Sequence, residues 1–290
     1  MKELKSCPVC QNISFQKFIT AKDYTVSRET FDLVKCDSCG LVRSDPVASP
    51  EFLAALYAQS TFDYGKQVNN LRITYGYYLA TLADYGVQKA SLLEIGSGNG
   101  FFLEEALRQG FTDVWGIEPS KSAVAIADPK LRPHLVCDVM RPRIFNSGQF
   151  DVICMFQVFD HIPDPATLLD ECFNVLKPKG LILCFNHNVD AASAHLMKAR
   201  SPIIDIEHTY LYNPSTLKRI FIDHRFDVKY VGPAQNTYDL YYLYRLLPLP
   251  KLLKQGGLTF LNGTQLGNIQ LRLSLGNLYL IAQKPPMANE

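Results

Sequence analysis

Four cysteines near the start of the sequence form its clearest set of metal-ligating side chains. Cys7 and Cys10 make one Cys-x2-Cys pair, and Cys36 and Cys39 make a second pair after 25 intervening residues. Two such pairs can present four thiolates tetrahedrally to one Zn²⁺ ion, which leaves no position open for a catalytic water. The spacing therefore predicts a structural zinc site. A redox dithiol is the alternative, although it would explain only one of the pairs.

A glycine-rich turn follows an apolar run further along the chain, with Gly96, Gly98 and Gly100 in a Gly-x-Gly-x-Gly spacing. Glycine suits a sharp turn that a ligand approaches too closely for a Cβ atom. The pyrophosphate-binding fingerprint has a different spacing, and the carboxylate of Glu94 before the turn would repel a pyrophosphate. The turn suits S-adenosylmethionine better, because that cofactor carries positive ammonium and sulfonium groups. A purely structural turn is the alternative.

Two further acidic residues end later apolar runs. Glu118, followed by Pro119, stands where an acidic residue accepts hydrogen bonds from two ribose hydroxyls. Asp138, followed by Val139, is placed to accept a hydrogen bond from an adenine amino group. Each residue alone has an ordinary explanation, as a carboxylate at a helix start or in a turn. Three acidic strand ends in this order predict a pocket for a nucleoside cofactor.

The elements that must position these residues alternate between short apolar runs and helical periods, which predicts a parallel α/β sheet with helices on both faces. The predicted strands are 92–95, 114–117, 135–137, 151–156, 181–185, 226–231 and 277–283. The predicted helices are one from Ser49 onward, then 69–85, 100–109, 120–127, 165–176 and 215–223. Three regions follow: a module over 1–45, a helical extension over 46–89, and a domain over 90–290 with an insertion at 235–276.

The runs LLEIGSGNGFFLEEA, GIEPS, VCDVM, FDVICMFQVFDHIPDP and LLDECFNVLKPKGLILCF resemble the Rossmann-like (class I) S-adenosylmethionine-dependent methyltransferase family, in order, over residues 90–190. The resemblance implies a seven-stranded sheet whose last two strands form an antiparallel hairpin. It implies that the three glycines line the methionine end of the cofactor and that Glu118 holds the ribose. It further implies that Asp138 and Val139 flank the adenine and that Phe156, Gln157 and Val158 form the pocket floor.

The segment 1–45 resembles a zinc ribbon, and a zinc ribbon joined to this core is similar to two groups of enzymes. One comprises sugar C-methyltransferases of deoxysugar pathways, and the other comprises zinc-ribbon rRNA guanine methyltransferases. The segment holds seven Lys and Arg against six Asp and Glu, and the whole chain has a net charge of +1. Nucleic-acid binding is disfavoured because it usually needs a basic excess. We expect a small-molecule acceptor, a sugar or glycan precursor. An RNA-directed methyltransferase or a non-catalytic binding module is the alternative.

Methyl transfer requires that the acceptor be positioned and deprotonated. The candidate bases are His187, between Asn186 and Asn188 after the fifth strand, and the histidines of two acidic–histidine pairs. His161 follows Asp160 after the fourth strand of the core, and His208 follows Glu207. In the sugar C-methyltransferases an acidic–histidine pair stands at the latter place, but their upstream tyrosine is replaced here by Asp205. His208 with Glu207 is therefore the first candidate and His161 the second. A histidine that only braces a turn is the alternative for each.

The sequence also predicts where the protein is located in the cell and which of its segments could bind other molecules. The first residues lack the apolar core of a signal peptide and no run of eighteen apolar residues occurs, so we expect a cytoplasmic protein. Cys137, Cys154, Cys172 and Cys184 are expected to be small core residues. The Leu- and Tyr-rich segment 238–254 is either a lid or membrane-surface patch for a lipid-linked acceptor, or a buried cap or dimer interface.

Overall fold

The computed structural model describes residues 6–22, 30–49, 52–53, 68–247 and 249–286 of the 290-residue chain. Its centre is a seven-stranded sheet in the order β10-β11-β8-β7-β4-β5-β6. Five neighbouring strands are parallel: β4 (Ser91–Ile95), β5 (Asp113–Ile117), β6 (Leu135–Val136), β7 (Phe150–Phe156) and β8 (Leu176–His187). The hairpin of β10 (Asp227–Asp239) and β11 (Gln270–Gln283) adds the two antiparallel strands. The predicted fold class is confirmed.

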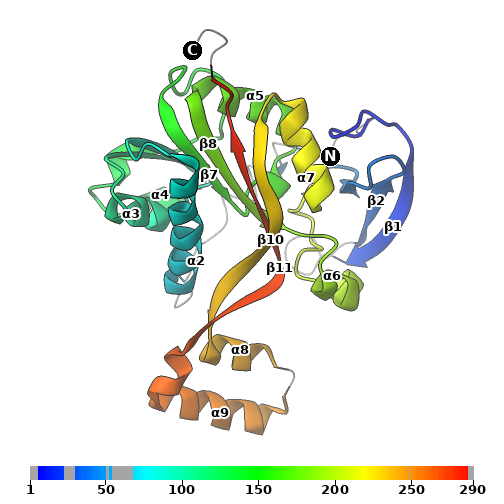
Figure 1. Ribbon diagram of the computed structural model, residues 1–290. Coiled ribbons are helices and arrows are strands. Elements are labelled where there is room, and N and C mark those ends of the chain that lie inside the picture. The colour runs from blue at the N-terminus through cyan, green and yellow to red at the C-terminus, as the bar shows by residue number, and fades with distance from the viewer. Residues whose placement is uncertain (1–5, 23–29, 50–51, 54–67, 248, 287–290) are drawn as a thin grey trace.

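Helices cover both faces of this sheet (Figure 1). One face carries α5 (Pro165–Val175) and α7 (Pro214–Asp223), and the other carries α2 (Val68–Thr81) and α3 (Phe101–Arg108). The short helix α4 (Lys121–Ala125) follows β5. Alternate residues of the central strands belong to two separate buried clusters. In β7, Ile153 and Met155 belong to one cluster, and Val152 and Cys154 belong to the other. Burial on both faces explains why these strands are continuous apolar runs in the sequence.

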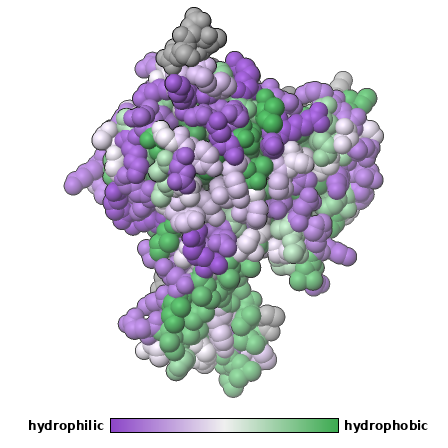
Figure 2. Space-filling view, in the orientation of Figure 1, coloured by the Kyte–Doolittle hydropathy of each residue, from purple (hydrophilic) through white to green (hydrophobic). Residues whose placement is uncertain are grey.

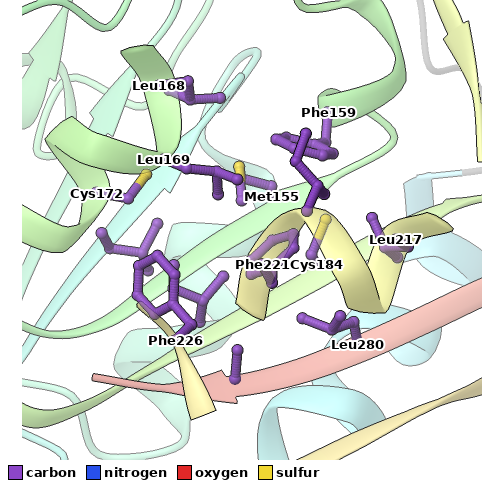
Figure 3. Close-up of a cluster of buried hydrophobic side chains, with 14 of the residues drawn as sticks. Met155, Phe159, Leu168, Leu169, Cys172, Cys184, Leu217, Phe221, Phe226 and Leu280 are labelled. Atoms are coloured by element: carbon purple, nitrogen blue, oxygen red, sulfur yellow. The ribbon is translucent and has the colours of Figure 1, made fainter. Parts of the chain in front are cut away.

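The cluster beneath α5 and α7 is built from Leu, Phe, Met and Cys side chains that interdigitate between the helices and the sheet (Figure 3). Cys172 and Cys184 are fully buried within it, and Cys154 is fully buried on the other face. These three cysteines are core residues as predicted. Cys137 is exposed, so that part of the prediction is wrong. It directly follows β6, a two-residue strand at the end of the sheet order, where no further strand covers it.

Local sequence explains where the helices begin and end. The carboxylate of Asp164 accepts a hydrogen bond from the Thr167 N–H, and proline occupies the first turn of α5. Asn213 and Thr216 form a reciprocal capping box at the start of α7. The helix predicted over 69–85 is α2 followed by a 3-10 turn, Leu82–Tyr85, which stops at Gly86 in the left-handed region (φ 71°).

The N-terminal residues form a second sheet, to which a later segment of the chain contributes one strand. β1 (Phe15–Lys22), β2 (Thr30–Cys36) and β3 (Val42–Asp45) form an antiparallel sheet, which ends in β9 (Tyr210–Leu211). β9 belongs to the segment just before α7. The N-terminal segment is therefore fastened to the larger domain by backbone hydrogen bonds and is not an independent unit.

Three boundaries differ from the sequence-based predictions. β8 begins at Leu176, directly after α5, because the Lys177–Gly180 segment continues the strand and does not form a separate connection. The insertion predicted at 235–276 is shorter in the structure, because β10 and β11 extend into it as far as Asp239 and from Gln270. A short helix, α6 (Ala192–Met197), was not predicted. The helix predicted from Ser49 lies mostly outside the described residues.

Two helices close the long hairpin at a distance from the sheet (Figure 1). They are α8 (Leu240–Leu246) and α9 (Lys251–Gly263), followed by a 3-10 turn, Gln265–Asn268. Among the described residues, no helix is both long and apolar enough to cross a membrane.

Candidate active site and cysteine cluster

The glycine-rich turn connects β4 to α3 at the edge of the sheet where the parallel strands end. Gly96, Gly98 and Gly100 all have positive φ angles of 76°, 53° and 81°. The Gly96 N–H donates to the Ile117 carbonyl at 2.8 Å, which ties the turn to the end of β5. A Cβ atom on Gly96 would lie 2.3 Å from Cγ2 of Val158. Glycine is therefore required there both by conformation and by space, and the predicted floor residue Val158 does lie against the turn.

Glu118 fastens the same turn from the end of β5. Its carboxylate accepts hydrogen bonds from the Gly98 N–H at 2.9 Å and from the Ser120 N–H at 2.8 Å. Burial raises the pKa of this carboxyl, and the two backbone donors oppose the rise. Each carboxylate oxygen retains acceptor capacity after one such bond, which fits the predicted bidentate role toward a ribose.

Glu94 is the less expected member of this group. Its side chain is 2% exposed, and its Oε2 has no hydrogen-bond partner within the described part of the chain. Burial, and then the nearby charge of Glu118, raise its pKa well above the usual range for a carboxyl. An orphaned buried carboxyl oxygen beside the turn fits a ligand that brings hydrogen-bond donors or positive charge. S-adenosylmethionine brings both.

The residues predicted to contact the adenine and to form the pocket floor make several hydrogen bonds within the protein. Asp138 accepts from the Val139 N–H and pairs with Arg141 at 2.6 Å, an ion pair that lowers its pKa despite the opposing effect of burial. Both of its oxygens are therefore engaged, Oδ1 by the Val139 N–H and Oδ2 by Arg141. Gln157 has a positive φ of 54°, and its N–H donates to the Phe185 carbonyl at 2.6 Å.

Phe156, the remaining residue of the predicted pocket floor, contacts α2, a helix that the sequence did not place near the pocket. The ring of Phe156 stacks on Tyr75 of α2 with a centroid distance of 4.0 Å and an interplanar angle of 12°. The helix α2 thus packs directly behind the predicted pocket floor.

Three histidines and two aspartates converge at the ends of β7 and β8. Nδ1 of His187 lies 2.8 Å from Oδ2 of Asp160, and the ring centroid of His208 is 4.8 Å from that of His187 and 4.4 Å from that of His161. Nδ1 of His208 lies 2.7 Å from Oδ1 of Asp205. We call Asp160, His161, His187, Asp205 and His208 the histidine cluster. Sequence analysis named His161 and His208 and the structure brings them together.

Asp160 is the centre of this cluster. Its side chain is fully buried, and its Oδ1 has no hydrogen-bond partner among the described residues. Burial alone would raise its pKa, but the hydrogen bond with His187 and the positive potential of the three imidazoles lower it. A carboxylate that stays ionised in a buried site attracts protons to the neighbouring imidazoles.

The two histidines nearest to each other differ in their titration. Burial lowers the pKa of His161 to about 4, so its imidazole is neutral near neutral pH. Burial also opposes protonation of His208, but the contact with Asp205 and the charge of Asp160 outweigh it and raise its pKa above the usual value. Nε2 of His208 has no hydrogen-bond partner in the described part of the chain. His208 therefore has a free nitrogen, an acidic orienting partner and a perturbed pKa, which are the properties of a general base.

Sequence analysis missed two members of the cluster as partners. Asp205, not Glu207, is the acidic residue in close contact with His208, and its Oδ1 also accepts the N–H groups of Glu207 and His208 at 2.9 and 3.0 Å. His187 was not predicted to contact Asp160. The one signal in the sequence was that both residues follow neighbouring parallel strands. Nitrogen and oxygen atoms of Asp160, His161 and His208 lie within 4.8 Å of one another, a spacing that a metal ion could also bridge.

The four N-terminal cysteines come together as predicted. The Sγ atoms of Cys7 and Cys39 lie 3.5 Å apart, as do those of Cys10 and Cys36, and all four lie within 4.8 Å of one another. Burial raises the pKa of Cys36, but backbone N–H groups directed at its sulfur outweigh that effect and lower the pKa to about 6. Four sulfurs at this separation, with backbone donors favouring a thiolate, fit a tetrahedral Zn²⁺ ion.

Comparison with known sequences connects the fold with a family. Residues 71–231, more than half of the chain, match the sequence profile described as "Methyltransferase domain". The chain belongs to the methyltransferase domain family. This family match covers the glycine-rich turn, Glu118 and the whole histidine cluster, and it leaves the cysteine cluster and the tip of the hairpin outside.

Individual relatives of this methyltransferase-domain chain are distant. It is 30% identical over 107 residues to a ubiquinone biosynthesis O-methyltransferase of Psychrobacter cryohalolentis, covering 34% of this chain and 41% of the relative. It is 29% identical over 143 residues to the protein of that name from Acinetobacter baumannii, covering 46% and 58%. The chain thus spans about half the length of these curated relatives.

A solved structure supports the fold. Geranyl diphosphate C-methyltransferase from Streptomyces coelicolor superimposes with a TM-score of 0.52 and 16% sequence identity, covering 82% of this chain and 99% of that one. At this level of identity the likeness shows a shared fold, the class I methyltransferase sheet.

Proposed function

We propose that this protein transfers a methyl group from S-adenosylmethionine to a small-molecule acceptor. The observation that supports this most is the cradle formed by Gly96, Gly98 and Glu118, which lies at the same edge of the sheet as the histidine cluster. A bound S-adenosylmethionine would supply a methyl group on a sulfonium, which is a good leaving group. The residues of the chain then have two tasks, which are to position the acceptor and to take its proton.

The cradle performs the binding and orienting task. Gly96, Gly98 and Gly100 would lie against the methionine end, Glu118 with the adjoining Pro119 would hold the ribose, and Glu94 would interact with a positive group. We propose Asp138 and Val139 as neighbours of the adenine. Phe156, Gln157 and Val158 would form the floor. The tight approach of Val158 to Gly96 supports this placement.

The histidine cluster performs the proton transfer in this proposal. His208 accepts the acceptor's proton at Nε2, which makes no hydrogen bond within the described part of the chain. Asp205 holds the imidazole at Nδ1 and stabilises the imidazolium that forms, while Asp160 adds negative potential from 3.9 Å. Glu207 contributes charge at longer range, because it raises the pKa of His208 without being its closest partner. His161, neutral near pH 7, is the second candidate for contact with the acceptor.

The acceptor that we propose is a hydroxyl-bearing sugar or glycan precursor. A neutral chain and a base placed at the strand ends favour a small molecule over RNA. The curated relatives support a second candidate, a precursor of a quinone, because they are ubiquinone biosynthesis O-methyltransferases. Both acceptors use the same base and the same cofactor cradle.

A labelled-methyl experiment tests this function. The purified protein is incubated with methyl-labelled S-adenosylmethionine and separate saccharide, quinone-precursor, lipid, protein and RNA fractions. Label in the saccharide fraction supports the first acceptor, and label in the quinone fraction supports the second. Label that enters RNA alone contradicts the small-molecule proposal. An absence of S-adenosylhomocysteine binding in calorimetry contradicts the methyltransferase proposal itself.

We also propose that Cys7, Cys10, Cys36 and Cys39 bind one structural Zn²⁺ ion. The convergence of four sulfurs within 4.8 Å supports this, and the closed set of four ligands assigns the ion no chemical step. Metal analysis of the purified protein tests it, with one zinc per chain expected. Zinc below one tenth of the protein concentration in protein prepared with zinc supplied would contradict the proposal.

A further inference from the structure

The ends of β10 and β11 leave the main sheet as a two-stranded ribbon. The two strands stay paired out to Asp239 and Gln270, whereas β8 accompanies β11 only between residues 277 and 283. The ribbon carries the helices α8 and α9, and we call residues 240–269 the helical tip. No described residue of α8 or α9 is buried. The tip therefore projects from the body of the protein (Figure 1).

The ribbon is held in a defined place by α2. The Asn70 side chain donates to the carboxylate of Asp239 at 2.8 Å, and the Thr237 N–H donates to Oγ1 of Thr74 at 2.8 Å. An isolated two-stranded ribbon is barely stable in water, so these contacts supply the support that it needs. The fold thus positions the tip, and its exposure is a property of the native structure.

The outer face of α9 is apolar. Leu252 is 85% exposed, Leu253 is 62% exposed and Phe260 is 59% exposed. Helical spacing places these three side chains within an arc of about 100°. Gly257, which faces Tyr244 of α8, lies beside one edge of that arc, next to Leu253. The tip stands out as the most continuously apolar part of the visible surface (Figure 2). Contiguous exposed apolar surface of this kind marks an interaction site.

The charge of the segment identifies the partner. Between Asp239 and Glu290 the sequence contains no acidic residue, whereas Arg245, Lys251 and Lys254 are basic residues of the tip. Two tips packed against each other would bring like charges together. A surface with anionic groups above an apolar layer complements both the leucines and the lysines.

We propose that the helical tip binds the surface of a membrane that contains anionic lipids. Leu252, Leu253 and Phe260 enter the boundary between headgroups and acyl chains, and the basic residues lie at the level of the lipid phosphates. The tip projects beyond the end of β8, so it extends from the same edge of the sheet as the histidine cluster. Membrane binding itself does not depend on the proposed methyl transfer.

Vesicle sedimentation tests the proposal on the full-length protein. Wild-type protein should sediment with vesicles of phosphatidylcholine and phosphatidylglycerol, more weakly at high salt, and much less with phosphatidylcholine alone. The triple variant Leu252→Ser, Leu253→Ser and Phe260→Ser should lower the partition coefficient about 100-fold. Leu196→Ser is the matched control, because Leu196 is also 85% exposed but lies on α6, and it should leave binding unchanged.

A second pair of variants tests the charge. Lys251→Gln with Lys254→Gln should weaken binding to the anionic vesicles about fivefold for each lysine removed. Lys218→Gln, on the exposed surface of α7, is the control. Binding of S-adenosylhomocysteine, measured by calorimetry, should be the same in every variant that folds, which separates this proposal from the proposed function.

Three results would overturn the proposal. The first is wild-type protein that stays in the supernatant with anionic vesicles at low salt. The second is a triple variant that sediments as well as wild type. The third is a concentration-dependent dimer in sedimentation velocity that the triple variant abolishes, because the tip would then be the interface between two copies of the chain.

Discussion

The cysteine cluster and the histidine cluster are assembled in different ways. Each cysteine pair spans four consecutive residues, so the pair is visible in the sequence before any fold is known. The histidine cluster draws Asp160, His187 and His208 from the ends of three separate segments. The cysteines are arranged by short turns, such as the Gly40 N–H that donates to the Cys36 carbonyl. The histidines are arranged by the sheet.

The two clusters also differ in what stabilises them. Four ionised thiolates in one place repel one another, so a cation such as the proposed Zn²⁺ would stabilise the cysteine cluster. The histidine cluster already combines acidic and basic side chains, because Asp160 contacts His187 and Asp205 contacts His208. Removing an ion should therefore collapse the first, whereas single side chains should be removable from the second without loss of the fold.

The largest expected effect is on the cysteine cluster. Cys36→Ser should abolish stoichiometric zinc and remove folding free energy on the order of 10 kcal/mol from the N-terminal sheet. The measurement is metal content together with hydrogen exchange of residues in β1 and β2. Cys137→Ser, a change at an exposed cysteine, should alter neither. Full zinc occupancy in Cys36→Ser would show that the four thiols are not the ligands.

The next effect is on proton transfer. His208→Ala should lower turnover with the true acceptor about 100-fold to 10,000-fold, because general-base catalysis contributes that much. S-adenosylhomocysteine affinity and thermal stability should change little. His195→Ala, at an exposed histidine of α6, is the control. Unchanged turnover in His208→Ala would remove His208 from the mechanism.

A smaller effect is expected at the cofactor turn. Gly96→Ala should destabilise the fold by about 2–4 kcal/mol, because a Cβ there meets Val158 and the positive φ is strained. Gly148→Ala is matched, with a φ of 62° and no atom within 4 Å of the added carbon, and should cost only about 1–2 kcal/mol. Urea unfolding of both variants gives the difference. Equal losses would mean that Val158 moves away freely.

The smallest effect is a shift in pH dependence. His208 acts as a base only when it is deprotonated, and its pKa is raised, so activity should rise with pH through a midpoint above 6.5. Asp205→Asn removes the close negative charge, lowers the pKa of His208 and should move that midpoint to lower pH. A pH–rate profile of wild type and variant measures the shift. An upward shift would contradict the assignment of His208 as base.

Most of the fold could be predicted from the sequence because apolar periodicity and capping residues determine elements locally. The seven strands and the glycine turn agree with the structure, as does the antiparallel hairpin that the family resemblance implies. The end of the hairpin could not be predicted in the same way, because the strand residues 234–239 look like loop until Thr74 and Tyr78 of α2 are there to bond them.

In the candidate site, too, features set by local sequence could be predicted, whereas contacts that depend on the fold could not. Glu118 could be predicted because its partner Gly98 belongs to a recognisable turn. The role of Asp205 could not, because it depends on a turn in which a side chain three residues before His208 reaches the imidazole. The resemblance to sugar C-methyltransferases favours the adjacent Glu207 instead. Neighbouring positions in the sequence point in different directions in space, and pattern matching cannot choose between them.

The pairing of β3 with β9, the short strand just before α7, links the cysteine cluster thermodynamically to the histidine cluster. The Ser44 N–H donates to the Thr209 carbonyl at 3.1 Å, so β3 holds the backbone directly after His208. Oxidation or chelation of the thiolates would release β3 and with it the loop that carries the base. The cofactor turn is held instead by β5, through the hydrogen bond from the Gly96 N–H to the Ile117 carbonyl. We expect such a protein to bind its cofactor still but to lose its methyl-transfer activity. The proposed zinc ion would then control a reaction in which it takes no chemical part.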